Sequence, residues 1–551
     1  MHVSYHGRKL ILYVFSCILL ATMYAQEIPP YAFRFPTGGR LLMDPIVDTT
    51  RIWILSEGRQ LFTLTETGTV IGKGTINFSE PAYAIPDAFG RLLITDGFSQ
   101  ADLYNERCKL VWSITFNGKL STAPLFDRDG FLYLCIDRNV LIYTPGGKLR
   151  TRYLLPGTPI QTCINNNNSN KLLFAVIRTD TGEIILISIM LPDLRVNQWE
   201  ISGKPLICIA HNDGVLCSIG NKLYYFSSKN LNPITIAEFP AQILTISLKN
   251  EYGAVLLSNN TLYLLLHDKT AWNVQLKADS ETKLFISSER IIAYNKKRAQ
   301  SFSLQGELFR EINITNSTTR LVPGKSGIIF SGGADWILYV YQFENLTAQY
   351  DAAYSENYQF PARTIVSSEL VWLSSGYSDE SFLPYLDRAS LALQKMEPLS
   401  ATDYGMLLGA AALVPGENLP DPEKNLSIPL RSRACMLLGN NGDPSAIPWL
   451  LETALKETDE TLVAAALNAI AAIGLDPYNI VLRKLSQNFT LPRSTQAALA
   501  LINCVMSIAV SQGISSALFD AAILLTKLQD SRFPEQVRKK ALEVQRILLR
   551  Q

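Results

Sequence analysis

The sequence has little histidine, and its charge is close to balanced. Of four histidines in the chain, only His211 and His267 lie beyond Ala25. A metal site built on several histidines is therefore excluded for the rest of the chain. The formal net charge is +1 at pH 7, which gives no electrostatic argument for a nucleic-acid partner. Because 47% of the residues are hydrophobic, we expect the chain to fold rather than stay disordered.

Motifs of nucleotide binding and nucleophilic catalysis are also missing. The patterns G-x-S-x-G, G-x-x-x-x-G-K-[ST] and G-x-G-x-x-G do not occur. Residues 127–130, Asp-Arg-Asp-Gly, resemble the start of a calcium loop but lack its later ligands and bidentate Glu, so a turn is the better interpretation. We predict no catalytic, cofactor-binding or metal-binding residues, no cofactor, and a protein that is not an enzyme.

The segment from Met1 to Ala25 has the pattern of a secretory signal. Arg8 and Lys9 form a basic end, residues 10–20 form an apolar run too short to span a bilayer, and Ala25 ends a cleavage-like stretch. A lipid on Cys17 is an alternative, since residues 14–17 loosely resemble a lipoprotein signal. No later stretch reads as a membrane span. We therefore expect an exported protein in the periplasm or cell envelope of a bacterium, membrane-associated only through a partner or a lipid.

Cysteines beyond Ala25 mostly stand singly in apolar stretches, where cysteine packs as a small hydrophobe. Cys208 and Cys217 are the pair with another interpretation. A hairpin turn at residues 212–213 would place the two thiols opposite each other, close enough for a disulfide. A turn at residues 213–214 would shift the register by one and separate them. Buried thiols and a disulfide both stay open.

A repeated unit runs along the first part of the chain: a proline, a turn and a strongly apolar strand. The prolines that open the units are Pro45, Pro81, Pro124, Pro159, Pro205, Pro240 and Pro323. The last interval is twice the others because a unit near Lys283 lacks its proline. Seven steps make eight units, and a period of this size predicts an eight-bladed β-propeller over residues 26–345. We expect residues 31–35 to supply the outer strand that locks the last blade.

The units resemble the repeats of quinoprotein-type (pyrroloquinoline-quinone-like) propellers. The matching pieces are Gln60-Leu61-Phe62 with Thr67-Gly68, Asp102-Leu103-Tyr104 with Trp112, Leu141-Ile142-Tyr143 with Gly147-Lys148, and Phe302-Ser303-Leu304 with Gly306. Only Trp112 keeps the family's Trp spacing, and Cys108 stands at that unit's turn glycine. The resemblance implies a propeller whose degenerate repeats are like those of members that bind proteins. It offers no matched position for calcium ligands or a catalytic base.

Beyond the units, residues 346–400 read as a connector with one helix, Phe382–Gln394. Residues 401–551 change to a helical period. An Ala-rich helix, a Gly, an Asp-Pro and a second helix occur around Asp443-Pro444 and again around Asp476-Pro477. Asp at the N-cap and Pro at the first position both favour a helix start. This pattern resembles HEAT repeats, which stack as an α-solenoid.

The sequence as a whole predicts a multidomain all-β plus all-α protein: an eight-bladed propeller followed by a short α-solenoid. We expect an exported, non-enzymatic binding or scaffold protein that holds a protein partner, without nucleic acid. A quinone- or metal-dependent oxidoreductase is one alternative. A polysaccharide or small-ligand binder is another, permitted by the Asn run at residues 165–168. The recurring aromatics are expected to pack in or against the blades: Trp53, Trp112, Tyr133, Tyr143, Tyr224 and Tyr225.

Overall fold

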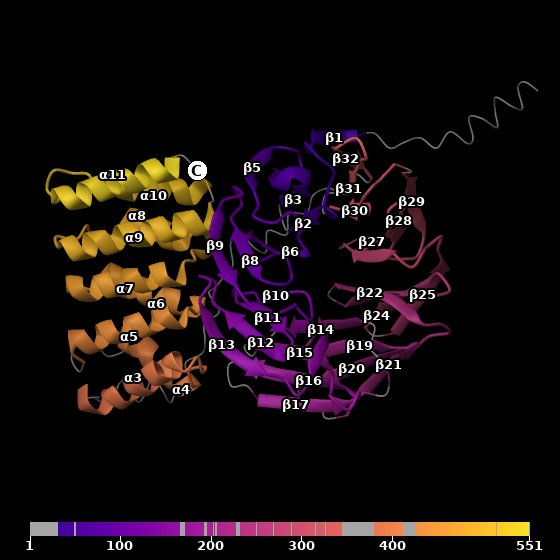
Figure 1. Cartoon of the computed structure of the whole chain (residues 1–551), viewed down its shortest axis with the longest axis horizontal. Coiled ribbons are helices and arrows are strands. Elements are labelled where there is room, and N and C mark those ends of the chain that lie inside the picture. Colours follow the sequence, from indigo (N-terminus) through magenta and orange to yellow (C-terminus); the bar gives the residue numbers. More distant parts are fainter. Residues whose placement is uncertain are drawn as a thin grey trace, which may run out of the picture. The chain divides into compact units, whose positions relative to one another are not determined.

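The computed structural model describes four stretches of the chain, shown in Figure 1. They are residues 31–343 (without 49–50, 166–170, 192–194, 202, 204–206, 228–231, 250, 268, 288, 315 and 325–326), 379–411, 426–513 and 515–549. The expected signal segment with Cys17, most of the Asn run and most of the connector lie outside these residues. The chain forms two compact units, and the first takes residues 1–45, 245–256 and 260–349.

Eight four-stranded sheets make the N-terminal part an eight-bladed β-propeller, as the period predicts. Each sheet is built from strands that follow one another in the chain, apart from the sheet that contains β1. Five sheets belong to the second unit: β2–β5 (Ile46–Val47, Arg51–Ser56, Gln60–Thr65, Val70–Thr75), β6–β9 (Tyr83–Pro86, Leu92–Thr95, Gln100–Tyr104, Leu110–Thr115), β10–β13 (Leu125–Phe126, Leu132–Ile136, Asn139–Tyr143, Leu149–Leu154), β14–β17 (Thr158–Asn165, Lys171–Arg178, Ile184–Leu191, Arg195–Glu200) and β18–β21 (Ile207–His211, Gly214–Ile219, Lys222–Ser227, Ile234–Glu238).

The first unit holds two whole sheets and most of a third. These are β22–β25 (Ile243–Lys249, Tyr252–Leu257, Thr261–Leu266, Lys269–Gln275), β26–β29 (Lys283–Ile286, Arg290–Tyr294, Arg298–Ser303, Leu308–Asn313), and β30–β32 (Val322–Pro323, Ile328–Gly332, Ile337–Gln342) with β1 (Tyr31–Pro36). β1 pairs antiparallel with β32, with Phe33 opposite Val340. The expectation that residues 31–35 lock the last blade is therefore confirmed, and Figure 1 shows β1 beside β32.

In the second unit, β7 and β11 are the second strands of two neighbouring blades, and they are mainly apolar because blades pack on their faces. All five residues of β11 are buried, as are all four of β7. Leu93 of β7 shares a hydrophobic cluster with Leu132 and Leu134 of β11 in the next sheet. The recurring aromatics take part in this packing, as expected: Trp53, Tyr133 and Tyr143 are buried, and Trp112, Tyr224 and Tyr225 are half-buried.

Two tryptophans each link a blade to the next one in the chain. Trp112 Nε1 donates to Pro145 O at 2.9 Å, and the ring lies where a side chain on Gly147 would clash. Trp272 Nε1 donates to Leu304 O at 2.8 Å, and its ring lies in the same way against Gly306. The sequence-based prediction that only Trp112 keeps the family's Trp spacing therefore missed Trp272, which makes the same contact. The spacing from Trp272 to Gly306 nearly equals that from Trp112 to Gly147, and a comparison of the two would have revealed Trp272.

Cys108 takes the place of a turn glycine, as the sequence suggests. Its backbone has φ +60°, in the left-handed region that Gly147 also adopts with φ +80°. The Cys108 N–H donates to Asn105 O at 2.9 Å and closes the turn. The thiol is buried against Thr63, and this burial raises its pKa to about 12. Cys108 is thus a packing residue in a strained turn.

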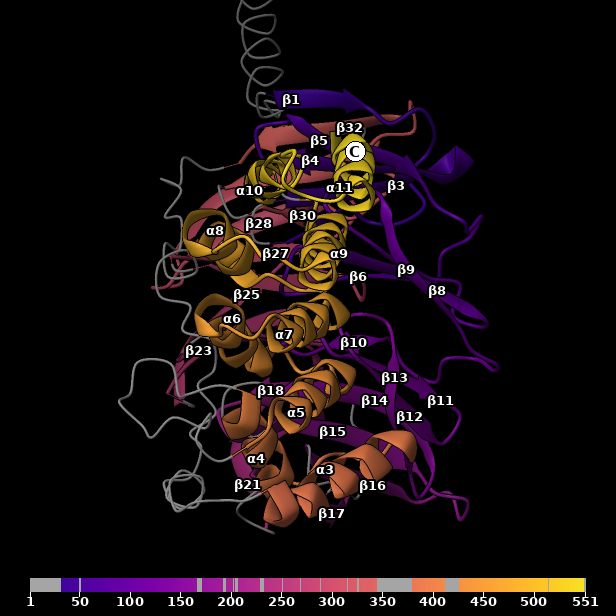
Figure 2. The ribbon, with the colours of Figure 1, turned by 90° about the vertical axis from the view of Figure 1, so that its left-hand side faces the viewer.

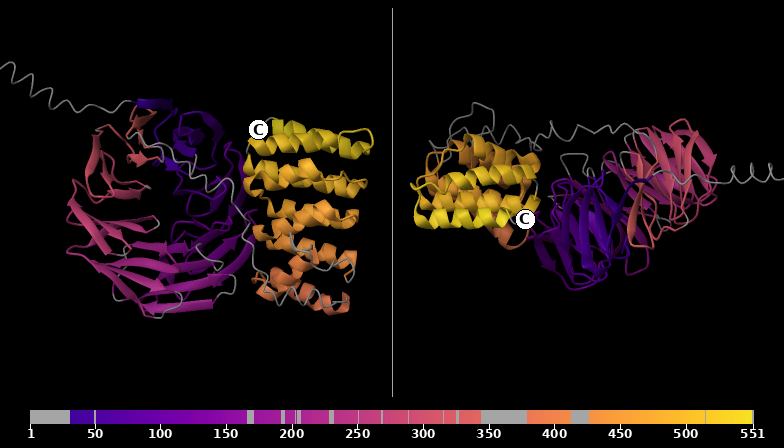
Figure 3. Two further views of the ribbon diagram at one scale, coloured as in Figure 1. Left: turned by 180° about the vertical axis from the view of Figure 1, so that it is seen from behind. Right: turned by 90° about the horizontal axis from the view of Figure 1, so that it is seen from above.

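The helices of the second unit pack in two rows, which Figures 2 and 3 show from different sides. One row is α3 (Asp379–Gln394), α5 (Ile428–Asn441), α7 (Glu460–Ile473), α9 (Thr495–Gln512) and α11 (Glu535–Leu549). The other is α4 (Ala401–Ala411), α6 (Ile447–Lys456), α8 (Ile480–Asn488) and α10 (Ser515–Lys527). The helix expected within the connector corresponds to α3, and its buried Phe382, Leu386 and Ala389 belong to the same hydrophobic cluster as the later helices.

The Asp-Pro pairs start short turns that lead into α6 and α8. Asp443 Oδ1 accepts the Ser445 N–H at 2.9 Å, and Pro444 is the first residue of the turn. Asp476 is fully buried, and its two carboxylate oxygens accept the N–H groups of Val481 and Leu482 at 2.7 and 2.8 Å. Both aspartates therefore satisfy amide donors that a helix start leaves unpaired.

α9 differs from one expectation. By length and composition it could cross a membrane, whereas the sequence was expected to hold no such stretch after the signal. It has 18 residues, and 61% of it is buried inside the protein, where Leu501, Val505 and Ile508 join the helical cluster. Burial of this kind is typical of the core helix of a helical stack.

Candidate binding groove at the junction of blades and helices

Three helices of one row end on a glycine in the left-handed conformation. Gly442 after α5 and Gly474 after α7 have φ +71°, and Gly513 after α9 has φ +68°. Only glycine adopts this conformation without a steric cost. The ends of α5 and α9 meet loops of the sheets β6–β9 and β10–β13, which lie in the same compact unit.

The end of α9 is held by two side chains from the turn between β8 and β9. Asn105 Nδ2 donates to Val510 O at 2.8 Å, and Arg107 Nε donates to Gly513 O at 2.8 Å. The last carbonyls of a helix lack partners within the helix and carry partial negative charge. An amide and a guanidinium therefore supply what the end of α9 needs.

The end of α5 is held by Arg150, from β13. Its Nε donates to Asn441 Oδ1 at 2.9 Å, and its Nη1 donates to Glu397 O at 2.6 Å. Burial lowers the pKa of Arg150 to about 10, and the nearby Asp443 carboxylate opposes that effect. The guanidinium remains charged at neutral pH and joins β13 to both the end of α5 and the segment after α3.

Arg91, the residue before β7, is a further arginine that joins α9 to the blades. Its Nε pairs with Asp87 Oδ2 at 2.7 Å, and both side chains are fully buried. Its Nη1 donates to Ser511 Oγ of α9 at 3.1 Å and to Pro145 O at 3.3 Å. One buried cation thus bonds to its own sheet, to the next sheet and to a helix.

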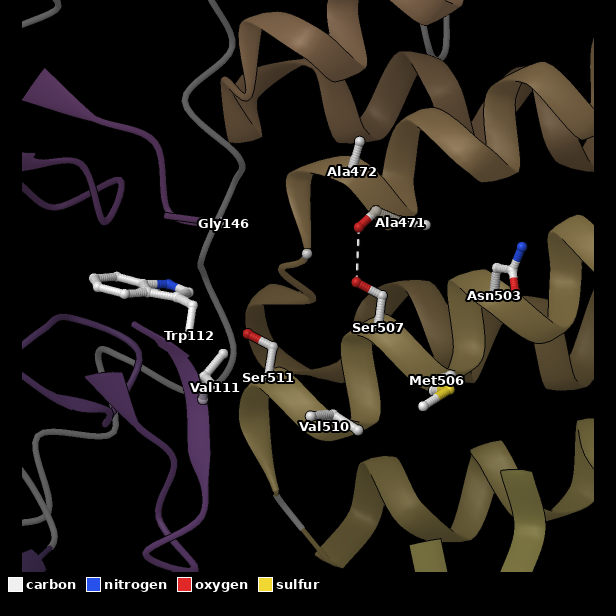
Figure 4. Close-up of a pocket in the computed structure, with 11 residues that line it drawn as sticks. Val111, Trp112, Gly146, Ala471, Ala472, Asn503, Met506, Ser507, Val510 and Ser511 are labelled. Atoms are coloured by element: carbon white, nitrogen blue, oxygen red, sulfur yellow. Dashed lines mark hydrogen bonds between the residues drawn. The ribbon is translucent and has the colours of Figure 1, made fainter. Parts of the chain in front are cut away.

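A groove opens beside these contacts, where α7 and α9 approach β9 (Figure 4). Its volume is about 350 Å³. The lining is mainly apolar and comes from both folds: Val111, Trp112, Gly146, Ala471, Ala472, Gly474, Asn503, Met506, Ser507, Val510 and Ser511. In Figure 4, Val111 and Trp112 stand on one side and the α9 residues on the other.

The polar groups of the groove differ in what they can still bind. Ser507 Oγ donates to Ala471 O at 2.7 Å, and Ser511 Oγ accepts from Arg91. Trp112 Nε1 is already bonded to Pro145. Asn503 is exposed at the rim. Among the described residues that line the groove, none is charged, so it suits one or two apolar side chains with a polar group near Asn503.

A second groove of about 420 Å³ lies between α9 and α11 and shares Asn503 with the first. Lys539 and Lys540 line it, and each is paired, with Glu535 at 2.6 Å and with Glu543 at 3.1 Å. Both grooves are therefore lined in part by α9.

The histidines and the Asp-rich turn considered as candidate sites in the sequence do not line the groove. His211 is half-buried at a hairpin, and His267 is exposed beside Glu251 at 3.2 Å. Asp127 Oδ1 accepts the N–H groups of Asp129 and Phe131, both at 2.9 Å, so residues 127–130 form a turn as expected. Within the described stretches, no group of three or more His, Cys, Asp or Glu side chains could hold a metal.

The hairpin that carries Cys208 and Cys217 turns at residues 212–213. Cys208 is paired directly with Cys217, so the first of the two registers is the one adopted. Both cysteines are free thiols.

The junction residues were not found from the sequence. Arg91, Arg107 and Arg150 follow no motif, and their helix partners Ser511, Gly513 and Asn441 lie 420, 406 and 291 residues away. A local pattern carries no information on such contacts.

Comparisons with known proteins find similar solved structures at low identity and no relative by sequence. No protein-family model matches the chain, and no curated protein matches its sequence. Among solved structures it is similar to BamB from Moraxella catarrhalis, with 9% identity, a TM-score of 0.41, and coverage of 57% of this chain and 100% of that one. For Saccharomyces cerevisiae Sqt1 the identity is 12% and the TM-score 0.45, over 58% and 100%. For BBS1N, solved in complex with ARL6DN, the identity is 13% and the TM-score 0.37, with coverage of 53% of this chain and 98% of that one.

Proposed function

We propose that this chain is an exported, non-enzymatic scaffold that holds a protein partner in the cell envelope of a bacterium. The observation that carries the proposal is the junction in the second unit. There, blades and helices are joined by buried arginines, and an apolar groove lined by both lies beside them. A groove fixed between two repeat folds offers a preformed surface, so little ordering free energy is lost on binding.

Two finer assignments belong to the same proposal. The blades are of the quinoprotein-like type, supported by the turn positions of Gly68, Gly147 and Gly306 and by the two tryptophans that dock on the next blade. The helices are of the HEAT type, supported by the repeated Asp-Pro turn between paired helices. Export is supported by the basic and apolar pattern between Met1 and Ala25.

The test is affinity capture from detergent-solubilised envelopes of the source organism, with residues 26–551 as the bait. Met506→Glu places a carboxylate in the groove, and Met436→Glu makes the same change on α5, where Met436 is 57% exposed and outside the groove. Asn503→Trp fills the rim from an exposed position, so it disturbs folding little. Circular dichroism checks that each variant is folded.

We expect one protein to be enriched by the wild type and by Met436→Glu, and to be lost with Met506→Glu and Asn503→Trp. Equal enrichment by all four baits would show that the groove is not the binding surface. If no protein is enriched while the chain retains a quinone or a saccharide added to the extract, the scaffold proposal is replaced by the oxidoreductase or ligand-binding alternative.

A further inference from the structure

The hairpin of β18 and β19 brings two thiols together in a geometry that the sequence left undecided. Its two-residue turn pairs His211 with Gly214, and three pairs further out Cys208 faces Cys217. In an antiparallel hairpin the pairs alternate, and the pair that closes a two-residue turn is a hydrogen-bonded one. Cys208 and Cys217 therefore form a non-hydrogen-bonded pair, in which opposite side chains approach most closely.

The two sulfur atoms lie close together in the structure. Cys208 Sγ and Cys217 Sγ are 3.0 Å apart, so a covalent bond needs them to close by about 1 Å. The register is held from outside the pair, because Asn165 Nδ2 donates to both Asn212 O and Gly214 O at the turn, at 2.9 and 2.8 Å. A fixed register means that bond formation needs no strand to slide.

The surroundings of the pair are apolar. Cys217 is fully buried and Cys208 is 8% exposed, in a cluster with Trp199, Val215 and Phe226. The hydrogen bond with Cys208, as the largest cause, and burial, as the second, raise the pKa of the Cys217 thiol well above its usual value. Because the folded hairpin buries both sulfur atoms, an oxidant reaches them most readily during folding, before neighbouring strands cover the hairpin.

We propose that Cys208 and Cys217 form a structural disulfide when the chain folds in the presence of a disulfide oxidant. The Sγ of one cysteine, as thiolate, attacks one sulfur of the oxidant's S–S bond, which forms a mixed disulfide and releases the oxidant's other sulfur as a thiol. The second cysteine attacks the mixed bond and releases the other thiol. The oxidant gains two electrons and two protons, and the chain loses both thiol hydrogens.

Cys163 is the competitor to be excluded. It lies on β14, half-buried, in contact with the same hydrophobic cluster. Burial raises its pKa far above the usual thiol value, with Cys208 adding to the effect. Cys163 and Cys208 sit on different sheets, whereas Cys208 and Cys217 share one pair of hydrogen-bonded strands. The strand pairing favours the Cys208–Cys217 bond.

The experiment refolds residues 26–551 from denaturant in a buffer of reduced and oxidised glutathione. Free thiols are then alkylated under denaturing conditions and counted by mass spectrometry. Of the eight cysteines only Cys17 is absent from this chain, so seven remain and we expect five to be alkylated. Cleavage before Asp213 separates the two cysteines, so a disulfide appears as two linked fragments that dithiothreitol releases.

Two variants with six cysteines each sharpen the outcome. In Cys208→Ser all six thiols should be alkylated, because Cys217 has lost its partner. In Cys435→Ala, which removes a buried thiol of α5, four should be alkylated and the linked fragments should persist. Alkylation of all seven thiols in the refolded wild type, or fragments linked through Cys163, would overturn the proposal. The wild-type map alone decides it if a variant does not fold.

Discussion

Removal of the Arg91 guanidinium should destabilise the junction more than removal of both members of its ion pair. Arg91 and Asp87 are fully buried and 2.7 Å apart. In Arg91→Met the Asp87 carboxylate stays buried without its cation, a change that costs about 3–5 kcal/mol of unfolding free energy. Asp87 Oδ1 still accepts the N–H groups of Phe89 and residue 91, both at 2.9 Å, so we expect the lower end of that range, about 3 kcal/mol.

The double variant Asp87→Asn/Arg91→Met removes both charges. The Asn oxygen can keep the two amide bonds, and the bonds to Pro145 and Ser511 are lost at about 1 kcal/mol each. Arg91 Nη2 is buried without a hydrogen-bond partner among the described residues, so its removal offsets part of that loss. We expect the double variant to be less stable than the wild type by about 1 kcal/mol or slightly more, hence more stable than Arg91→Met.

The assay is native-state hydrogen exchange of the full chain, read by mass spectrometry in peptides covering residues 83–95 and 500–513. Local exchange is suited here because a chain with two folds need not unfold in one step. Arg107→Met, which removes a half-buried arginine bonded to Gly513 O, is the matched control and should cost about 1 kcal/mol. If the single and double variants lose protection equally, the buried charge of Asp87 does not dominate and the reasoning is refuted.

Two further predictions concern the helices. Burial raises the pKa of Asp476 to about 7, against about 3.9 in the unfolded chain, so the folded state holds this proton more tightly. The contribution of Asp476 to the free energy of unfolding should therefore be fully present below about pH 4 and should fall by up to roughly 4 kcal/mol as the pH rises through 7. The difference between wild type and Asp476→Asn, from urea unfolding followed by circular dichroism between pH 4 and 8, should show this fall, and parallel profiles would contradict it. Gly442→Ala should cost more than Gly474→Ala although both have φ +71°, since a new Cβ would lie 2.6 Å from Thr144 Cγ2 at the first and 3.6 Å from Ser507 Oγ at the second. Each variant should lose about 1 kcal/mol of unfolding free energy because alanine is strained in the left-handed backbone, and only Gly442→Ala should lose more. Equal midpoints in thermal unfolding would show that the Thr144 side chain moves aside without a cost.

The blades were predictable because each repeats a local pattern. An apolar strand must be buried on both faces, and a turn must follow it, so the period of about 40 residues is written into the chain one unit at a time. β1 could also be assigned, since its alternating aromatics precede the first unit and a ring needs its last edge paired. Trp272 could be recognised only from its distance to the turn of the next blade, because its indole contacts that turn and not its own strand.

The groove could not be predicted in the same way. Val111 and Trp112 lie on β9, and Met506 and Val510 lie on α9, near the other end of the chain. Each of these residues also fits the ordinary apolar pattern of its own strand or helix. Nothing in either pattern distinguishes a side chain that meets a neighbouring fold from one that meets its own core.

The sequence by itself determined the blade number, the closing strand and the helical character of the C-terminal part, because these follow from periodicity and turn chemistry within short stretches. It left two hairpin registers open for Cys208 and Cys217, and the tertiary structure decided for the one that places the thiols opposite each other. Tertiary structure also decided where Arg91, Arg107 and Arg150 go. Their partners on the helices are Ser511, Gly513 and Asn441, which lie in parts of the chain that only folding brings next to these arginines.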